Sequence, residues 1–190
     1  GYLKLIQDAG IPVIFRPFHE AAGDYGYGAW FWWGAEGVEV TRQLWDHLRD
    51  KLMNQYGIHN LVWCWTVQTL SSGELASIDL LQNAYPGNDK CDFVGVDIYS
   101  DTDLFSDFDT FYLTRELVEG KKMVALSECG NLFDPETAFP KGETWLYFMQ
   151  WYENQSGQFG MYNYSPAETW RQVVASPYTL GRDEVKALRK

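Results

Sequence analysis

The amino-acid sequence predicts an α/β protein whose strands form part of a (β/α)8 TIM-type barrel, for three reasons. Short apolar runs alternate with longer amphipathic segments, repeating about every 30 to 50 residues as successive β/α units do. Each run is short and mostly apolar, as in parallel strands buried on both faces. Polar residues gather just after the runs, where a barrel assembles its active site. An open doubly wound sheet also fits the alternation, but no GxGxxG motif follows the first run.

The expected elements follow from the apolar runs and from glycines that stop helices. We predict strands over residues 11–16, 60–65, 93–99, 122–128 and 158–164. We predict helices over residues 36–56, 107–119, 142–156 and 183–190, the first three of which end next to Gly57, Gly120 and Gly157. The opening segment, YLKLIQDAG, resembles the last turns of a helix already under way. We therefore expect the chain to begin inside a domain.

Composition narrows the class of ligand. The 190 residues suffice for one domain with a substantial core, and the net charge of −11 argues against nucleic acid and against an anionic membrane surface. No apolar stretch approaches the length of a membrane span. Aromatic residues reach 17%, with 9 Trp and 12 Tyr, which fits either an aromatic-rich core or a cleft that stacks neutral, flat ligands such as sugars.

The sequence predicts neither a metal nor a cofactor. Cys64, Cys91 and Cys129 are widely spaced and form no CxxC pair, so zinc-ribbon and thioredoxin-type sites are not expected. The His19-Glu20 pair could begin an HExxH zinc motif, but Gly23 stands where the second histidine would be.

Two glutamates stand out at the ends of predicted strands. Glu20 follows the first strand among aromatic residues, and Glu128 ends the fourth. Two carboxylates about 5–5.5 Å apart hydrolyse glycosides with retention, one as nucleophile and the other as acid and base. Ser127 is a poor nucleophile candidate, because GxSxG would need glycine at Ala125 and at Cys129. We interpret Arg16 as an ion-pair partner rather than a substrate clamp.

An ordered set of motifs carries a family resemblance over essentially the whole chain. RPFHE, WFWWG, YPGNDKCDFVGVDIY, ALSECG and SPYTLGRDE together resemble glycoside hydrolase family 26, whose best-known members are endo-β-1,4-mannanases. The resemblance implies a (β/α)8 barrel with the acid/base after strand 4 and the nucleophile after strand 7. Carried onto this sequence, those residues are Glu20 and Glu128. Residues 1–190 would then be a partial catalytic barrel domain with strands 4 to 8, lacking the N-terminal strands 1 to 3.

The same resemblance implies further site residues. His19 would line the cleft beside the acid/base, Tyr99 would hydrogen-bond the nucleophile, and Asp97 would lie nearby. An aromatic stretch would flank the cleft, formed by Phe31, Trp32 and Trp33. The sequence departs from the family in an extra AAGDYGYGA segment before WFWWG, and in a predicted last strand, GMYNYS, without the usual following Trp. The candidates to replace that Trp are Tyr162, Tyr164 and Trp170.

The resemblance also implies a β-mannan substrate, a secreted enzyme and a requirement for the N-terminal barrel segment. Three alternatives stay open at this stage. The same mechanism could act on xylan or mixed-linkage glucan, because aromatic platforms do not read the axial 2-hydroxyl of mannose. A degenerate, non-catalytic carbohydrate-binding barrel would leave both glutamates without a role, as would a structural interaction module.

Overall fold

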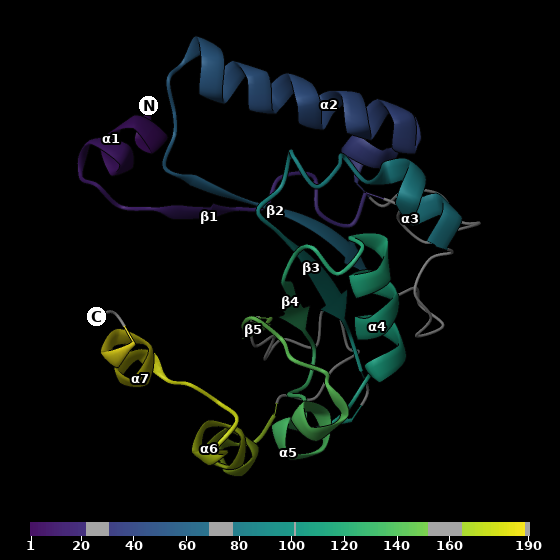
Figure 1. Cartoon of the computed structure of the whole chain (residues 1–190), viewed down its shortest axis with the longest axis vertical. Coiled ribbons are helices and arrows are strands. Elements are labelled where there is room, and N and C mark those ends of the chain that lie inside the picture. The colour runs from purple at the N-terminus through teal and green to yellow at the C-terminus, as the bar shows by residue number, and fades with distance from the viewer. Residues whose placement is uncertain (22–30, 69–77, 101, 152–164, 189–190) are drawn as a thin grey trace, which may run out of the picture.

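Five parallel strands make up the sheet in the described part of the chain (Figure 1). The structure is a computed structural model that describes residues 1–21, 31–68, 78–100, 102–151 and 165–188. The strands run in chain order: β1 (Val13–Phe15), β2 (Leu61–Gln68), β3 (Phe93–Ile98), β4 (Val124–Cys129) and β5 (Phe148–Gln150). Consecutive order with parallel pairing is the pattern of a barrel wall, and these strands form a half-barrel.

Helices connect the strands. They are α1 (Tyr2–Asp8), α2 (Val38–Asp50), α3 (Ile78–Ala84), α4 (Phe108–Leu117), α5 (Pro135–Ala138), α6 (Ala167–Ala175) and α7 (Arg182–Ala187). Shorter turns are 3-10 helical at Trp32–Gly34 and Phe139–Lys141, and a π-helical turn at Lys51–Gln55 extends α2. Local sequence sets some of the ends. Asp107 caps α4 by accepting a 3.1 Å hydrogen bond from the Thr110 amide, and Gly120 takes a left-handed φ of 65° shortly after that helix.

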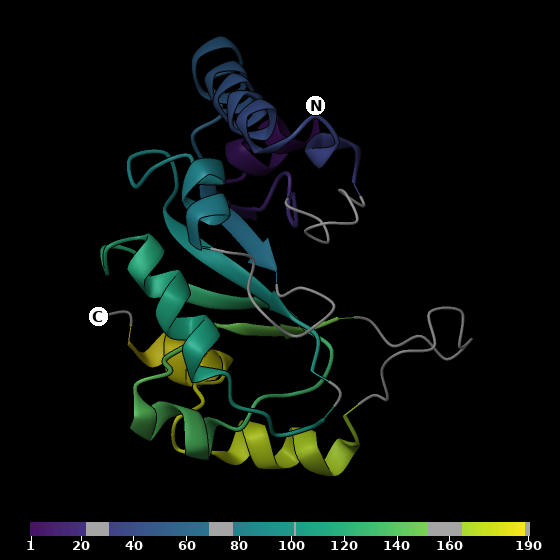
Figure 2. The ribbon, with the colours of Figure 1, turned by 90° about the vertical axis from the view of Figure 1, so that its right-hand side faces the viewer.

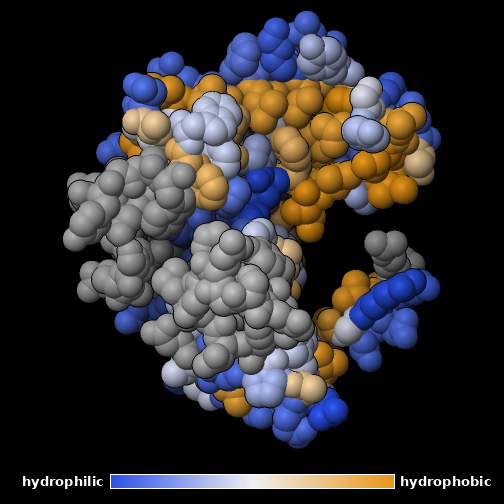
Figure 3. Space-filling model, turned by 180° about the vertical axis from the view of Figure 1, so that it is seen from behind, coloured by the Kyte–Doolittle hydropathy of each residue, from blue (hydrophilic) through white to orange (hydrophobic). Residues whose placement is uncertain are grey.

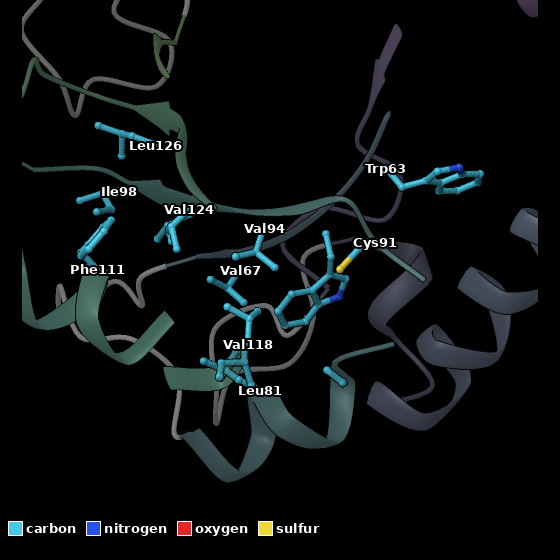
Figure 4. Packing of buried hydrophobic residues seen from close by; sticks show 14 of the residues in the cluster. Trp63, Val67, Leu81, Cys91, Val94, Ile98, Phe111, Val118, Val124 and Leu126 are labelled. Carbon is cyan, nitrogen blue, oxygen red and sulfur yellow. The ribbon is translucent and has the colours of Figure 1, made fainter. Parts of the chain in front are cut away.

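The main core lies between the outer face of the sheet and helices α2, α3 and α4, which run along one side of the strands (Figure 2). Alternate strand residues such as Trp63, Val67 and Val94 face these helices and meet side chains such as Leu81 and Phe111 (Figure 4). Burying one such side chain contributes about 1.5–3 kcal/mol, so this layer supplies much of the stability of the half-barrel.

The inner face of the sheet holds a smaller apolar cluster below the polar strand ends. Cys64, Phe93 and Ala125 are buried there, and the Tyr147 ring packs edge-on against Phe93 at 5.9 Å. Towards the outer strands this face is open. The side chain of Ile14 on β1 is 54% exposed, and no partner strand pairs with the outer edge of β1 or β5 among the described residues.

The C-terminal helix stands apart from the body of the molecule. Every residue of α7 is exposed, and Leu180 and Leu188 beside it are 58% and 70% exposed. In a space-filling view, a broad apolar area faces the gap that separates this helix from the rest (Figure 3). No helix in the described ranges has the length and apolar composition needed to cross a membrane.

The structure confirms the first four predicted strands, with ends shifted by up to three residues. It places the fifth strand of the sheet, β5, inside a segment predicted to be a helix. The helix predicted over residues 142–156 is wrong at its centre, because residues 148–150 form β5. Backbone hydrogen bonds hold this segment against β4, among them those from the Leu146 amide to Val124 O at 2.7 Å and from the Trp151 amide to Cys129 O at 2.8 Å. The strand predicted over 158–164 lies outside the described residues.

Candidate active site

The segment after β1 reaches the site through an irregular turn. Phe18 and Glu20 both adopt left-handed backbone angles, with φ of 55° and 51°. Such conformations cost roughly 1–2 kcal/mol each for residues other than glycine, so surrounding contacts must hold them. The aromatic segment supplies such a contact: Trp33 Nε1 donates to the carbonyl of His19 at 2.8 Å, and the Trp33 carbonyl in turn accepts from Thr41 Oγ1 at 2.7 Å.

A β-bulge in β4 sets the direction of Glu128. Val96 of β3 aligns with Leu126, but Asp97 aligns with Glu128, so Ser127 is an extra residue between the two pairs. Registered partners of neighbouring strands point to the same face, and a bulge re-aims the side chains that follow it. Glu128 therefore lies beside Asp97 at the carboxyl end of the sheet.

An ion-pair network occupies this end of the sheet. Arg16 Nη1 contacts both carboxylate oxygens of Asp97, at 2.9 and 3.2 Å, while Nη2 of the same guanidinium donates to Glu128 Oε1. The second oxygen of Glu128 accepts a 2.5 Å hydrogen bond from the Tyr99 hydroxyl. Ser127 Oγ donates to Asp97 Oδ1 at 2.6 Å. Donors on both of its oxygens fix the orientation of the Glu128 carboxylate.

Burial and charge shift the pKa values in this network in opposing ways. Burial would lower the pKa of Arg16, but the charges of Asp97 and Glu128 outweigh it and raise that pKa above its ordinary value. Burial raises the pKa of Asp97 well above its usual range, and Arg16 opposes this shift. Burial, together with the hydrogen bond to Glu128, raises the pKa of Tyr99, so the phenol keeps its proton and acts as a donor.

An aromatic cluster lies beside these charges. The ring of Phe31 stacks on Trp33 at 4.3 Å, and His19 packs against both, at 4.8 and 5.4 Å. Burial and the nearby Arg16 charge lower the pKa of His19, which favours the neutral imidazole. Trp32 is 71% exposed and presents its ring to solvent. Flat rings and a neutral imidazole suit an uncharged polar ligand.

Glu20 completes a group of three carboxylates. One oxygen from each of Glu20, Asp97 and Glu128 lies within 4.8 Å of the other two. Three carboxylates at this spacing could ligate a divalent ion, but Arg16 already pairs with two of them. An ion would have to compete with that guanidinium. The arrangement is better suited to two carboxylates acting on one bond, with a fixed cation beside them.

The structure brings together most of the residues singled out from the sequence. Glu20, Asp97, Tyr99 and Glu128 meet at the strand ends, with His19, Phe31, Trp32 and Trp33 in the adjoining segment, whereas Tyr162 and Tyr164 lie outside the described residues. The position of Arg16 between two carboxylates matches its interpretation as an ion-pair partner.

Trp151 was not among the residues singled out from the sequence. The expectation of a last strand without a following Trp concerned residues 158–164, which lie outside the described residues, whereas Trp151 directly follows β5 and is 41% exposed. The Trp151 amide donates to the carbonyl of Cys129, the residue after Glu128. The backbone of Trp151 therefore lies near the end of the sheet that carries Glu128. Trp151 stands in the sequence FMQWY, which could have been predicted as a strand followed by Trp. It was not, because residues 142–156 were predicted to form a helix. Trp170, the one candidate for this Trp that lies within the described residues, is on α6, and its ring is 6.0 Å from that of Phe148.

Comparisons with known proteins agree with this architecture. A mannan endo-1,4-beta-mannosidase of Thermothelomyces thermophilus is 32% identical over 185 residues, which is 97% of this chain and 34% of that protein. The chain thus spans about a third of that relative. A beta-mannanase from a symbiotic protist of the termite Reticulitermes speratus, solved with gluco-manno-oligosaccharide, matches 96% of this chain and 51% of its own, with 32% identity and a TM-score of 0.78.

A second solved structure gives the same result. The GH26-CBM35 beta-(1,4)-mannanase of Podospora anserina is 32% identical, with a TM-score of 0.79 over 99% of this chain and 38% of its own. The model of glycosyl hydrolase family 26 matches residues 1–184. These matches cover nearly every residue of the half-barrel, including both glutamates and the strands that carry their partners, and on that evidence the chain belongs to glycosyl hydrolase family 26.

Proposed function

We propose that this chain is the catalytic part of a retaining endo-β-1,4-mannanase, with Glu128 as nucleophile and Glu20 as acid/base. The observation that carries the proposal is the carboxylate pair. Oxygens of Glu20 and Glu128 lie within 4.8 Å of each other, close to the separation of about 5–5.5 Å typical of retaining enzymes and shorter than the roughly 6.5–9.5 Å of inverting ones.

The proposed reaction has two steps. Glu128 attacks the anomeric carbon of the bound mannosyl unit, the glycosidic C–O bond breaks, and Glu20 donates its proton to the departing oxygen. Water then attacks the anomeric carbon of the glycosyl-enzyme, Glu20 accepts the water proton, and the bond to Glu128 breaks. Arg16 and Tyr99 both donate to Glu128. They hold the carboxylate in line for attack, and they stabilise its negative charge when its bond to the sugar breaks.

The proposed substrate is a β-mannan, with xylan or mixed-linkage glucan as the alternatives. Support for mannan comes from the relatives, which are named as mannan-cleaving enzymes, and from the gluco-manno-oligosaccharide in one solved structure. The net charge of −11 also suits a neutral polymer. We assign substrate binding to residues beside the two glutamates, namely His19, Phe31, Trp32, Trp33, Asp97 and Tyr99. We also assign it to Tyr162 and Tyr164, which lie outside the described residues.

We further propose that β1 to β5 are barrel strands 4 to 8, and that residues 1–190 act together with an N-terminal segment that supplies strands 1 to 3. Among the described residues no strand pairs with the outer edges of β1 and β5, and Ile14 is exposed; both observations support this assignment, because a barrel closes by pairing such edges. We also propose secretion, since a mannan polymer is met outside the cell.

The test is replacement of Glu128 by Ala in the complete enzyme. Turnover of mannan should fall by several orders of magnitude, because no glycosyl-enzyme can form. Glu143 offers a matched control: it is also a buried glutamate, but it binds Ser106, the Asp107 amide and Trp145 rather than the strand ends. Glu143→Gln should reduce stability and keep most of the activity. Full activity of Glu128→Ala would remove Glu128 from the nucleophile role.

A further inference from the structure

Ser127 is a fully buried hydroxyl for which the reaction above has no use. It precedes Glu128 in β4, and in a regular strand two neighbouring side chains would point to opposite faces. The bulge changes this, because Ser127 is the extra residue between the pairs Val96–Leu126 and Asp97–Glu128. Its hydroxyl therefore reaches Asp97 Oδ1 at 2.6 Å, on the same side of the sheet as Glu128.

Gly95 provides the space for this hydroxyl. A Cβ atom on Gly95 would lie 2.4 Å from Ser127 Oγ and 2.7 Å from Ser127 Cβ, distances that real atoms do not adopt. The backbone of Gly95 does not have a left-handed φ, so no turn requires glycine there. The glycine is needed for the close approach of the Ser127 side chain from the neighbouring strand.

The hydroxyl is the first member of a continuous chain of contacts. Ser127 donates to Asp97, Asp97 accepts both contacts from Arg16 Nη1, and Nη2 of that guanidinium then faces Glu128. A guanidinium is planar and rigid, so the direction of its second nitrogen follows from how the first is held. The rotation of the Asp97 carboxylate thus sets where Arg16 meets Glu128.

We propose that Ser127 is a positioning residue, which acts through Asp97 and Arg16 to orient the Glu128 carboxylate. The proposal rests on the proposed role of Glu128 as nucleophile. The titratable and charged groups around Asp97 include Arg16 and Glu20 from the segment after β1, Cys64 from β2, Tyr99 directly after β3, Glu128 and Cys129 from β4, and Tyr147 directly before β5. The Ser127 hydrogen bond and the Arg16 charge keep the pKa of Asp97 from rising still further.

The experiment replaces Ser127 by Ala and by Cys in the complete enzyme. Ser127→Ala should lower kcat on mannan roughly 10- to 150-fold, the effect of losing one hydrogen bond to a charged group, with little change in KM. Without this donor the pKa of Asp97 rises, so the acid limb of kcat/KM should move to higher pH. Ser127→Cys keeps a weak donor of similar size and should fall between the parent and Ser127→Ala.

Thr114→Val is the matched control. Thr114 is equally buried and donates from its hydroxyl to Thr110 O at 2.8 Å, but within α4. It should lose stability without moving the acid limb, which separates a loss of packing from a loss of positioning. An unchanged kcat and acid limb in Ser127→Ala, with an active parent, would overturn the proposal.

Crystal structures of the parent and of Ser127→Ala give a reading that does not depend on turnover. The Asp97 carboxylate should rotate, and the Arg16–Glu128 contact should lengthen. If the parent proves inactive on mannan, the proposed function fails, and this comparison still decides the positioning role: unmoved Arg16 and Glu128 side chains would refute it.

Discussion

Replacing Tyr99 by Phe should reveal which of the two steps the phenol serves. The Tyr99 hydroxyl donates to Glu128 Oε2 at 2.5 Å, and Arg16 holds the other oxygen. A hydrogen bond to a charged group is worth about 1.5–3 kcal/mol, which corresponds to a factor of roughly 10 to 150 in rate. Glu128 loses its charge when it attacks and regains it when the glycosyl-enzyme breaks down. The donor therefore helps the second step more than the first.

The expected result is a lower kcat together with accumulation of the glycosyl-enzyme. With an aryl mannoside that has a good leaving group, rapid mixing should show a burst of aryl alcohol about equal to the enzyme concentration, followed by slow turnover. Apparent KM should fall as well, since the intermediate builds up. Because Phe keeps the ring, its packing should be preserved. A parental kcat with no burst would refute the reasoning and place the Tyr99 hydrogen bond outside catalysis.

Two further replacements test the neighbouring residues. Glu20→Ala should keep measurable cleavage of aryl glycosides whose leaving groups need no proton, and should lose cleavage of the polymer; equal losses on both would contradict the acid/base role. His19→Phe keeps an aromatic ring against Phe31 and removes a titrating group. Because the folded-state pKa of His19 lies below its ordinary value of 6.5, its contribution to stability is full above that pH and declines as the pH falls further. Denaturant unfolding at pH 7.5 and pH 5 should therefore show a smaller loss on acidification in His19→Phe than in the parent, and equal losses would contradict the shift.

The sequence predicted β1 to β4 because each is a short run of apolar residues between polar or glycine-containing segments. It failed at β5, where the letters WLYFMQW offer apolar residues at almost every position and so satisfy a helix as well as a strand. What decides the conformation there is pairing with β4, from Val124 to Cys129. No local pattern contains that long-range partner.

In the site, too, the sequence predicted what local patterns carry and not what depends on pairing between strands. The polar residues at strand ends indicated Glu20 and Glu128, because parallel strands bring their carboxyl ends to one edge, and the family resemblance added Asp97 and Tyr99. The sequence did not indicate the bulge at Ser127. A bulge is a choice of register between two strands, and it leaves no mark in the composition of either one.

The half-barrel itself leads to the last prediction, that residues 1–190 produced alone will aggregate or pack loosely and show negligible mannanase activity. The outer edges of β1 and β5 have no partner among the described residues, and Ile14 and Met149 on those strands are 54% and 40% exposed. Unpaired edges and exposed apolar side chains promote association. The two glutamates stand on different strands, and a misplacement of about 1 Å can cost a hundredfold in rate.

The measurements are near-ultraviolet circular dichroism and mannan hydrolysis, for the chain alone and with a separately produced segment carrying strands 1 to 3 of the same enzyme. The added segment should sharpen the aromatic bands and restore turnover, because it pairs both edges and so fixes the distance between Glu20 and Glu128. A segment with Pro placed in its edge strands is the matched control, since Pro cannot complete the ladder. A soluble monomer with sharp aromatic bands and high turnover from residues 1–190 alone would show that closure by an N-terminal segment is not required.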